Sequence, residues 1–161
     1  MNFEEKLAKL TELNTMTELE RREKIWSREL DELYDRITEN WLKEYVEAGY
    51  VNPHFYRVES DEYEYYDIMA VEVFLACKFR VVLEPVRINV TGAFGITDLY
   101  WEGHKDEKVS LLLIQNEDDS EKLYWEIWKG RKQEDRIPLN KETFESLLNE
   151  WLERWAEIDN V

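Results

Sequence analysis

The sequence has little of the residue types that cross-link, bend or break a chain. Cys77 is its single cysteine, and it has two histidines, five glycines and three prolines. One cysteine excludes a disulfide scaffold and a multi-cysteine zinc site. So few glycines and prolines exclude low-complexity and collagen-like chains. Because Cys77 stands within an apolar run, we expect a buried, reduced thiol.

Long apolar runs are also missing. The best candidate, residues 68–83, is interrupted by Glu72, Lys78 and Arg80, so no membrane span is predicted. The first five residues are acidic at Glu4 and Glu5 and show no basic segment ahead of an apolar core, unlike a secretory signal. Together with the lone thiol, these features predict a cytoplasmic protein.

Positive charge is scarce relative to negative charge. The 161 residues contain 21 Lys and Arg against 37 Asp and Glu, a net charge of −16. The length suggests one domain, and 43% hydrophobic with 14% aromatic residues excludes a disordered acidic tail. The charge repels duplex DNA and anionic membranes and favours a basic protein partner.

The first 49 residues have helical periodicity. Apolar residues at steps of three and four predict a short first helix: Phe3, Leu7, Leu10 and Leu13. Thr17 and Glu20 have the spacing of a capping box, which predicts the start of a second helix. That helix is expected to end at Gly49, in a left-handed position. Its predicted buried stripe contains Trp26, Leu30, Leu33, Ile37, Trp41 and Tyr45.

The predicted second helix is long for a domain of this size. At about 1.5 Å per residue it approaches about 45 Å. We therefore expect it to contact more than its own sheet, which suggests a homodimer formed through this long N-terminal helix and its stripe.

The middle of the chain alternates in hydrophobicity as strands do. Residues 73–83 predict one strand that ends at Pro85, with Cys77 on its buried face. Four more strands are expected, over residues 86–90, 96–101, 109–115 and 123–128. Residues 92–95 are interpreted as a turn and residues 116–120 as a hairpin loop. Neighbouring strands without helices between them predict an antiparallel meander.

The last element is predicted to be an amphipathic helix. Asn140 is a candidate N-cap. The apolar stripe contains Phe144, Leu147, Leu148, Trp151, Leu152, Trp155 and Ile158. The prediction for the whole chain is one α+β domain over residues 1–161. It has helices at 1–49, an antiparallel sheet of about five strands at 55–128, and a helix at 140–159 packed on that sheet.

Acidic and tyrosine residues are concentrated between the helical part and the strands. Residues 59–72 contain six acids and no base. Carboxylates spaced along an exposed ribbon imitate a row of phosphates, and the phenol rings among them offer contact area at low entropic cost. The candidate partner-binding residues are Glu59, Asp61, Glu62, Tyr63, Glu64, Tyr65, Tyr66 and Asp67. The alternative is a solvated loop whose charge protects a sheet edge.

A basic turn at residues 129–136 supports a second hypothesis. Cations beside aromatic rings are the components of single-strand nucleic-acid binding. The candidate residues are Trp128, Lys129, Arg131, Lys132 and Arg136. The order of Gly130-Arg131-Lys132, Ile137 to Asn140, and Phe144 resembles the sheet-to-helix junction of positive-cofactor-four-like single-strand-DNA binders. It departs from them by the insertion at 133–135, the N-terminal helices and the acidity.

Signs of catalysis are few. The histidines, His54 and His104, stand apart from each other, and the sequence has no nucleophile elbow and no glycine-rich phosphate loop. A third hypothesis is a metal-dependent hydrolase that uses Asp98 with residues 106–108, Asp-Glu-Lys. The leading hypothesis is a non-catalytic protein, of the inhibitor, immunity or nucleic-acid-mimic type, that covers a basic surface of its partner. It predicts no catalytic residue, cofactor or metal.

Overall fold

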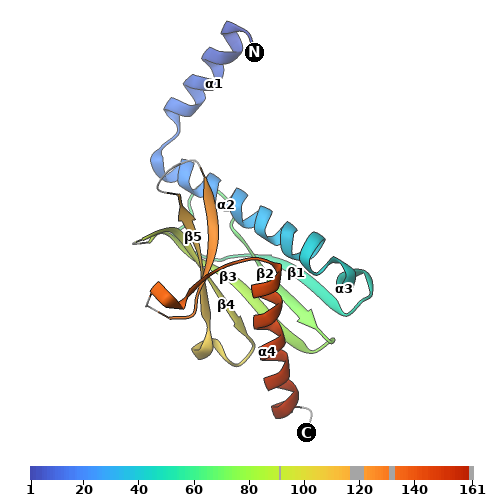
Figure 1. Ribbon diagram of the computed structural model, residues 1–161. Helices are drawn as coiled ribbons and strands as arrows, with labels where there is room; N and C mark the ends of the chain where they lie inside the picture. The colour runs from blue at the N-terminus through green and yellow to red at the C-terminus, as the bar shows by residue number, and fades with distance from the viewer. Residues whose placement is uncertain (91, 117–121, 131–132, 160–161) are drawn as a thin grey trace.

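The computed structural model describes residues 1–90, 92–116, 122–130 and 133–159. In this part of the chain, seven strands form one antiparallel sheet in the order β1-β2-β3-β4-β5-β6-β7. The strands are β1 (Val51–Arg57), β2 (Met69–Leu75), β3 (Phe79–Val90), β4 (Ala93–Trp101), β5 (Val109–Gln115), β6 (Leu123–Trp128) and β7 (Arg136–Pro138). The helices are α1 (Phe3–Thr15), α2 (Glu18–Arg36), η1 (Ile37–Trp41), α3 (Lys43–Glu47), η2 (Lys105–Glu107), η3 (Gln133–Asp135) and α4 (Lys141–Asp159). The α+β meander is confirmed (Figure 1).

The second N-terminal helix is not the single long helix that was predicted to end at Gly49. Thr17 caps α2 as predicted, because its hydroxyl accepts the backbone N–H of Glu20 at 3.1 Å. The helix is interrupted at the π-turn η1, where the N–H of Leu42 donates to the carbonyl of Ile37 at 2.8 Å. A π-turn adds one residue to the helical repeat and so rotates the buried face. Leu42 is therefore buried, while Trp41 is half-buried.

The predicted dimer stripe lies inside the chain's own core. Trp26, Leu30, Leu33 and Ile37 are each 0% exposed. Tyr45, beyond the π-turn, is 43% exposed. The part of the stripe that lies on α2 is thus packed in the core of the same chain.

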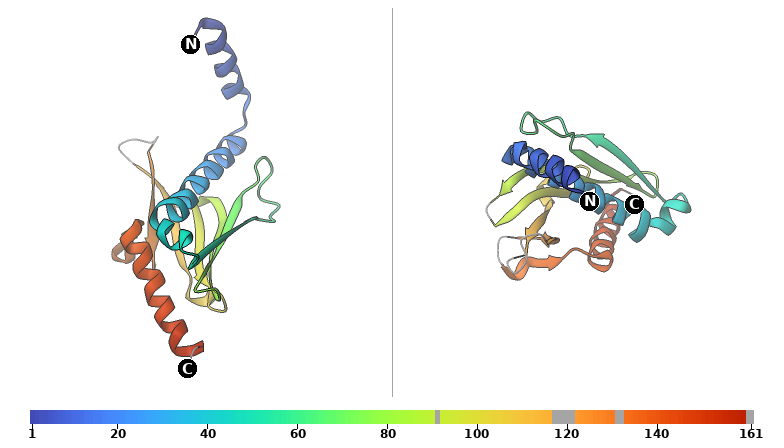
Figure 2. Two further views of the ribbon diagram at one scale, coloured as in Figure 1. Left: turned by 90° about the vertical axis from the view of Figure 1, so that its right-hand side faces the viewer. Right: turned by 90° about the horizontal axis from the view of Figure 1, so that it is seen from above.

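Helices α2 and α4 share one face of the sheet. Trp26 of α2 packs on Trp125 of β6 with ring centroids 5.7 Å apart, and the Trp155 ring of α4 lies 5.5 Å from that of Phe79. The N-terminal helices contact α4 where the ring of Trp41 packs on that of Phe144, with centroids 5.7 Å apart. The packing of the C-terminal helix on the sheet agrees with the prediction (Figure 2). Helix α1 instead projects away from the body (Figure 1 and the left view of Figure 2).

Gly95 of β4 allows α2 to approach the sheet closely. A Cβ atom at this position would lie 2.5 Å from Cζ3 of Trp26. The indole ring therefore packs directly on the strand backbone. Residues 92–95 were expected to be a turn, but Phe94 and Gly95 are buried within β4, and Gly92 alone has the left-handed φ of 84°.

The strand expected over residues 73–83 is a hairpin. Leu75 and Phe79 are directly opposite each other in the β2–β3 register, so both point to the core face. The alternation therefore continues unchanged across the three-residue turn. Cys77 lies in that turn with a φ of 68° and is exposed, so its predicted burial is wrong.

The sheet is wider than residues 55–128. Strand β1 begins at Val51, and β7 adds a short edge after the predicted last strand. Pro85 does not end its strand. It lies next to a bulge, where the register with β4 shifts between Pro85 and Arg87. Strands β5 and β6 have the predicted bounds.

The sheet face opposite α2 and α4 carries a polar network. Arg80 donates to Glu72 at 2.7 Å, and the Tyr100 hydroxyl donates to Glu84 at 3.0 Å. Burial and the neighbouring Glu84 raise the pKa of Tyr100. Val82, which lies directly opposite Glu72 and Tyr100 in the strand register, is 0% exposed. Within the described ranges, none of the helices combines the length and apolar character that a membrane crossing needs.

Candidate functional site

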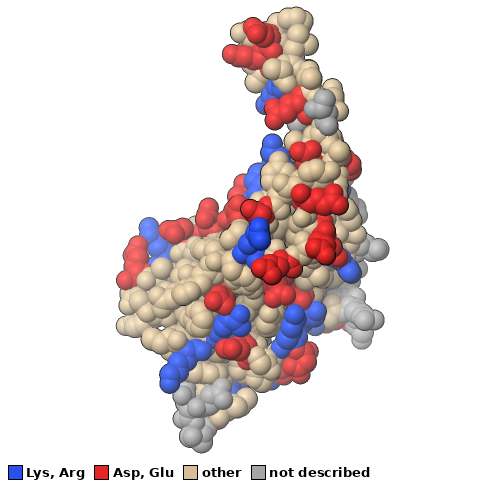
Figure 3. Space-filling view, turned by 180° about the vertical axis from the view of Figure 1, so that it is seen from behind, with Lys and Arg blue, Asp and Glu red and all other residues tan. Residues whose placement is uncertain are grey.

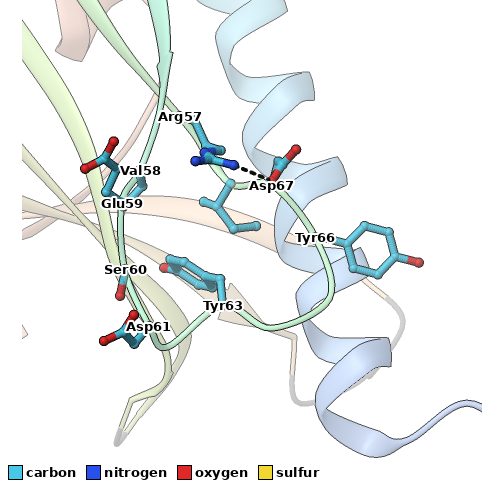
Figure 4. Close-up of a pocket in the computed structure, with 9 residues that line it drawn as sticks. Arg57, Val58, Glu59, Ser60, Asp61, Tyr63, Tyr66 and Asp67 are labelled. Atoms are coloured by element: carbon cyan, nitrogen blue, oxygen red, sulfur yellow. Dashed lines mark ion pairs between the residues drawn. The ribbon is translucent and has the colours of Figure 1, made fainter.

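The acidic tyrosine residues form the loop between β1 and β2, here called the acidic loop (residues 58–68). Its two ends are joined, because the N–H of Val58 donates to the carbonyl of Ile68 at 2.8 Å. Next to this pair, Arg57 and Asp67 form an exposed ion pair at 3.6 Å (Figure 4). The loop is thus closed at its base by strand pairing.

A buried carboxylate holds the far side of the acidic loop on α2. Glu23 is 0% exposed. Its oxygens accept the backbone N–H groups of Glu64 at 3.2 Å, Tyr65 at 2.9 Å and Tyr66 at 3.2 Å. Three charge-assisted bonds satisfy both the carboxylate and the loop backbone. The loop is therefore ordered before any partner arrives.

The tyrosines of the acidic loop have different roles. Tyr63 is half-buried, and its hydroxyl accepts the indole N–H of Trp26 at 3.2 Å. Burial raises the pKa of Tyr63 to about 12. Tyr66 is half-buried against the core, whereas Tyr65 is 45% exposed. Of the three predicted contact tyrosines, Tyr65 therefore offers a free ring, and Tyr63 and Tyr66 mainly hold the loop in place.

The carboxylates of the acidic loop face solvent. Glu59, Asp61, Glu62 and Glu64 are exposed and form no ion pair with another described residue. Glu72, counted with them in the sequence, lies on β2 and is bound to Arg80. Figure 3 shows acidic side chains gathered where α1 meets the body. The surface on offer is therefore a cluster of four unpaired carboxylates beside the Arg57–Asp67 pair.

The acidic loop encloses a hollow of about 440 Å³. The ring of Tyr63 lies between the two arms of the loop, while Glu59 and Asp61 point away from α2 (Figure 4). Arg57 contributes a guanidinium and Asp67 a carboxylate to its lining. A hollow with polar walls and an acidic rim is suited to a cationic side chain.

Sequence reasoning missed Glu23 and Trp26 as parts of this site. The signal was present: Glu23 precedes Trp26 by three residues and so occupies a position on the apolar stripe of α2. A charged residue on a buried stripe requires a partner. The partner is separated by about 40 positions in the chain, so the sequence pattern could not identify it.

The basic turn forms a different feature from the one predicted. Arg131 and Lys132 lie outside the described residues. Arg136 stacks on the ring of Trp128 at 3.7 Å, and Lys129 is exposed. Arg136 Nε and Trp128 Nε1 are buried without a hydrogen-bond partner among the described residues. The arginine therefore occupies the ring face on which a base would stack.

Of the residues of the hydrolase hypothesis, the structure brings Asp98 and Lys108 together, while Glu107 binds elsewhere. Lys108 binds Asp98 at 3.1 Å. Glu107 is turned toward Arg154 of α4, and this guanidinium lowers the pKa of the Glu107 carboxyl. Within the described residues, no three His, Cys, Asp or Glu side chains are grouped so as to hold a metal ion.

Comparisons with models of protein families, with curated proteins and with solved structures found no match for this chain.

Proposed function

We propose that the protein is a non-catalytic interaction protein that covers a basic surface of a protein partner with its acidic loop. The observation that carries this proposal is the attachment of the loop to α2 through Glu23, whose carboxylate accepts three loop N–H groups. A loop that is ordered in advance avoids the entropic cost of ordering on binding.

Electrostatics supports a basic partner. Four unpaired carboxylates lie on one loop of a chain with a net charge of −16. Such a field accelerates association with a positive surface, and the acceleration falls as salt rises. Tyr65, 45% exposed beside these carboxylates, supplies a ring for the centre of the contact.

The test is affinity capture from cells that produce the chain naturally, with two variants of equal charge. The loop variant carries Glu59→Gln, Asp61→Asn, Glu62→Gln and Glu64→Gln. The control variant carries four amide substitutions at exposed acids elsewhere: Glu39→Gln, Glu150→Gln, Glu153→Gln and Glu157→Gln. We expect basic proteins to bind the wild type and the control but not the loop variant. Equal loss in both variants would mean that net charge alone drives capture.

Salt gives an independent measurement on any captured partner. Between about 50 and 500 mM salt, the association rate should fall steeply while the dissociation rate changes less. An association rate that stays constant over this range contradicts the electrostatic mechanism.

A second candidate function is single-strand nucleic-acid binding at the basic turn. The Arg136 guanidinium on the Trp128 ring, beside the exposed Lys129, favours it, because cations next to an aromatic ring are the components of such a site. A gel shift with labelled oligonucleotides distinguishes the two functions. A blank gel is expected for an acidic interaction protein. A shift that Arg131→Glu with Lys132→Glu abolishes would support nucleic-acid binding instead.

A further inference from the structure

Helix α1 exposes an apolar face that none of the described residues of its own chain covers. Phe3, Leu7 and Leu10 are 76%, 49% and 56% exposed. Their spacing of four and three residues places them on one side of the helix. The helix is well formed, since Asn2 and Glu5 complete a capping box at its start. An ordered helix with an open apolar stripe is typical of a segment that binds in a groove.

A groove of matching character lies elsewhere in the molecule. It has a volume of about 740 Å³ and runs between α4 and the segment that joins α3 to β1. Its walls are mainly apolar, with Leu42, Val51 and Leu148 buried in them. Tyr50, at the edge, is 66% exposed. The groove therefore has the volume and the apolar lining to receive side chains of a helix.

The charges at the two surfaces are complementary. Lys6 lies three residues after Phe3 and four before Leu10, so it flanks the apolar stripe of α1, and Lys9 extends this flank. The groove is bordered by Glu142 and Glu145 of α4. Oε1 of Glu145 is buried and has no hydrogen-bond partner among the described residues. A lysine ammonium would satisfy it.

The groove lies beyond the reach of the chain's own α1. Helix α1 leaves the body at the N-terminal end of α2, and the groove begins at Leu42, beyond the other end. This separation is roughly 35 Å at about 1.5 Å per residue. The 13 residues of α1 span about 20 Å, and the two-residue link adds at most about 7 Å. A second copy is needed to fill the groove.

We propose that two copies form a symmetric dimer in which α1 of each copy binds in the groove of the other. With the two α2 helices antiparallel, each α1 starts near the far end of its partner's α2, where the groove lies. The contact is isologous and closes on itself. Reciprocal exchange doubles the buried area, which matters because specific interfaces bury about 1,200–2,000 Å² in total.

The first test is the oligomeric state of the full chain by sedimentation over a range of concentrations. We expect a dimer in the wild type and a monomer for Leu7→Glu with Leu10→Glu. The variant removes two buried leucines from each copy, four per dimer, so the dimer dissociation constant should rise by roughly 100-fold or more. Both leucines are exposed, so unchanged circular dichroism is expected to confirm folding. Glu5→Gln with Glu12→Gln, on the opposite side of α1, should remain dimeric.

The second test is complementation between two defective copies. The α1 variant Leu7→Glu with Leu10→Glu keeps a working groove, and the groove variant Tyr50→Glu with Glu145→Lys keeps a working α1. Each alone should be monomeric, and their mixture should form a heterodimer through one restored contact. In addition, Lys6→Glu should restore dimers in the Glu145→Lys chain.

Three outcomes would overturn the proposal. One is a wild-type chain that stays monomeric at about 100 μM. Another is a dimer that persists in the α1 variant, which would place the interface elsewhere. The third is a monomeric wild type whose α1 binds phosphatidylcholine vesicles, which would make the apolar stripe a lipid-binding surface. None of these outcomes bears on capture of a basic partner by the acidic loop, so the two proposals fail separately.

Discussion

Removal of the Glu23 carboxylate should release the acidic loop and destabilise the protein by a measurable amount. Glu23 accepts three backbone N–H groups from the loop while it is itself 0% exposed. A hydrogen bond to a charged group contributes about 1.5–3 kcal/mol. The lower value gives about 4.5 kcal/mol for three bonds. Water that enters the released loop offsets part of this, so Glu23→Ala should lower the free energy of unfolding by about 2–3 kcal/mol.

The substitution Glu23→Gln separates charge from shape. Oε1 of Glu23 accepts the N–H groups of Tyr65 and Tyr66, and Oε2 accepts that of Glu64. A glutamine keeps one acceptor oxygen but places an NH₂ group against the third N–H. We expect a loss of about 1–2 kcal/mol, smaller than for alanine. Glu32→Ala, an exposed position on the same helix, is the matched control and should change stability by less than about 0.5 kcal/mol.

Two measurements test this reasoning. Urea unfolding followed by tryptophan fluorescence gives the free energies, and hydrogen exchange reports the loop directly. In the wild type, the amides of Glu64, Tyr65 and Tyr66 should be protected. In Glu23→Ala these three amides should exchange near the rate of a free peptide. The amides of β5 should still exchange slowly, almost as in the wild type. Retained protection of the three loop amides would refute the structural role given to Glu23.

Further predictions concern the sheet, the buried phenol and the thiol. Gly95→Ala should cost about 1–3 kcal/mol through overpacking against Trp26, and less in a Trp26→Phe background; an equal cost in both would refute the close contact. Because the pKa of Tyr63 is raised from 10.0 to about 12, its contribution to stability is present below pH 10 and is lost as the pH rises toward 12. Tyr63→Phe should reduce the loss of stability in this pH range, to which Tyr34, Tyr56 and Tyr100 with their raised pKa values also contribute, and an unchanged unfolding profile would contradict this. Cys77 should react with a thiol reagent in the folded protein as fast as a free thiol, whereas a requirement for denaturant would place it in the core.

Helix and strand patterns predicted the architecture because they follow from local periodicity. The stripe of α2, the N-caps at Thr17 and Asn140, and the bounds of β5 and β6 agree with the structure. The predicted stripe of α4 agrees as far as Trp155, whereas Ile158 is 61% exposed. Each depends on residues within a few positions of one another, and such signals are visible in a sequence.

The predictions that failed concern places where the hydrophobic periodicity of the sequence continues although the secondary structure changes. The β2–β3 turn conserves alternation, because Leu75 and Phe79 are directly opposite each other. It also lacks the Gly, Pro, Asn or Asp residues that mark turns, so Cys77 was assigned to a strand. The π-turn at η1 similarly interrupts a helix without any proline or glycine. The positions of such turns are decided by tertiary packing, and the hydrophobic pattern of a sequence contains no information about that packing.

The candidate site shows why net charge overstates the free negative surface. The acid total counts Glu23, Glu72 and Asp98 equally with Glu59, yet these three are bound to loop amides, Arg80 and Lys108. A carboxylate that is already bound contributes to stability and has less to offer a partner. Only a comparison of variants with equal net charge can therefore separate recognition from general repulsion. If the geometry of the acidic loop matters, its four unpaired carboxylates should outweigh four remote ones.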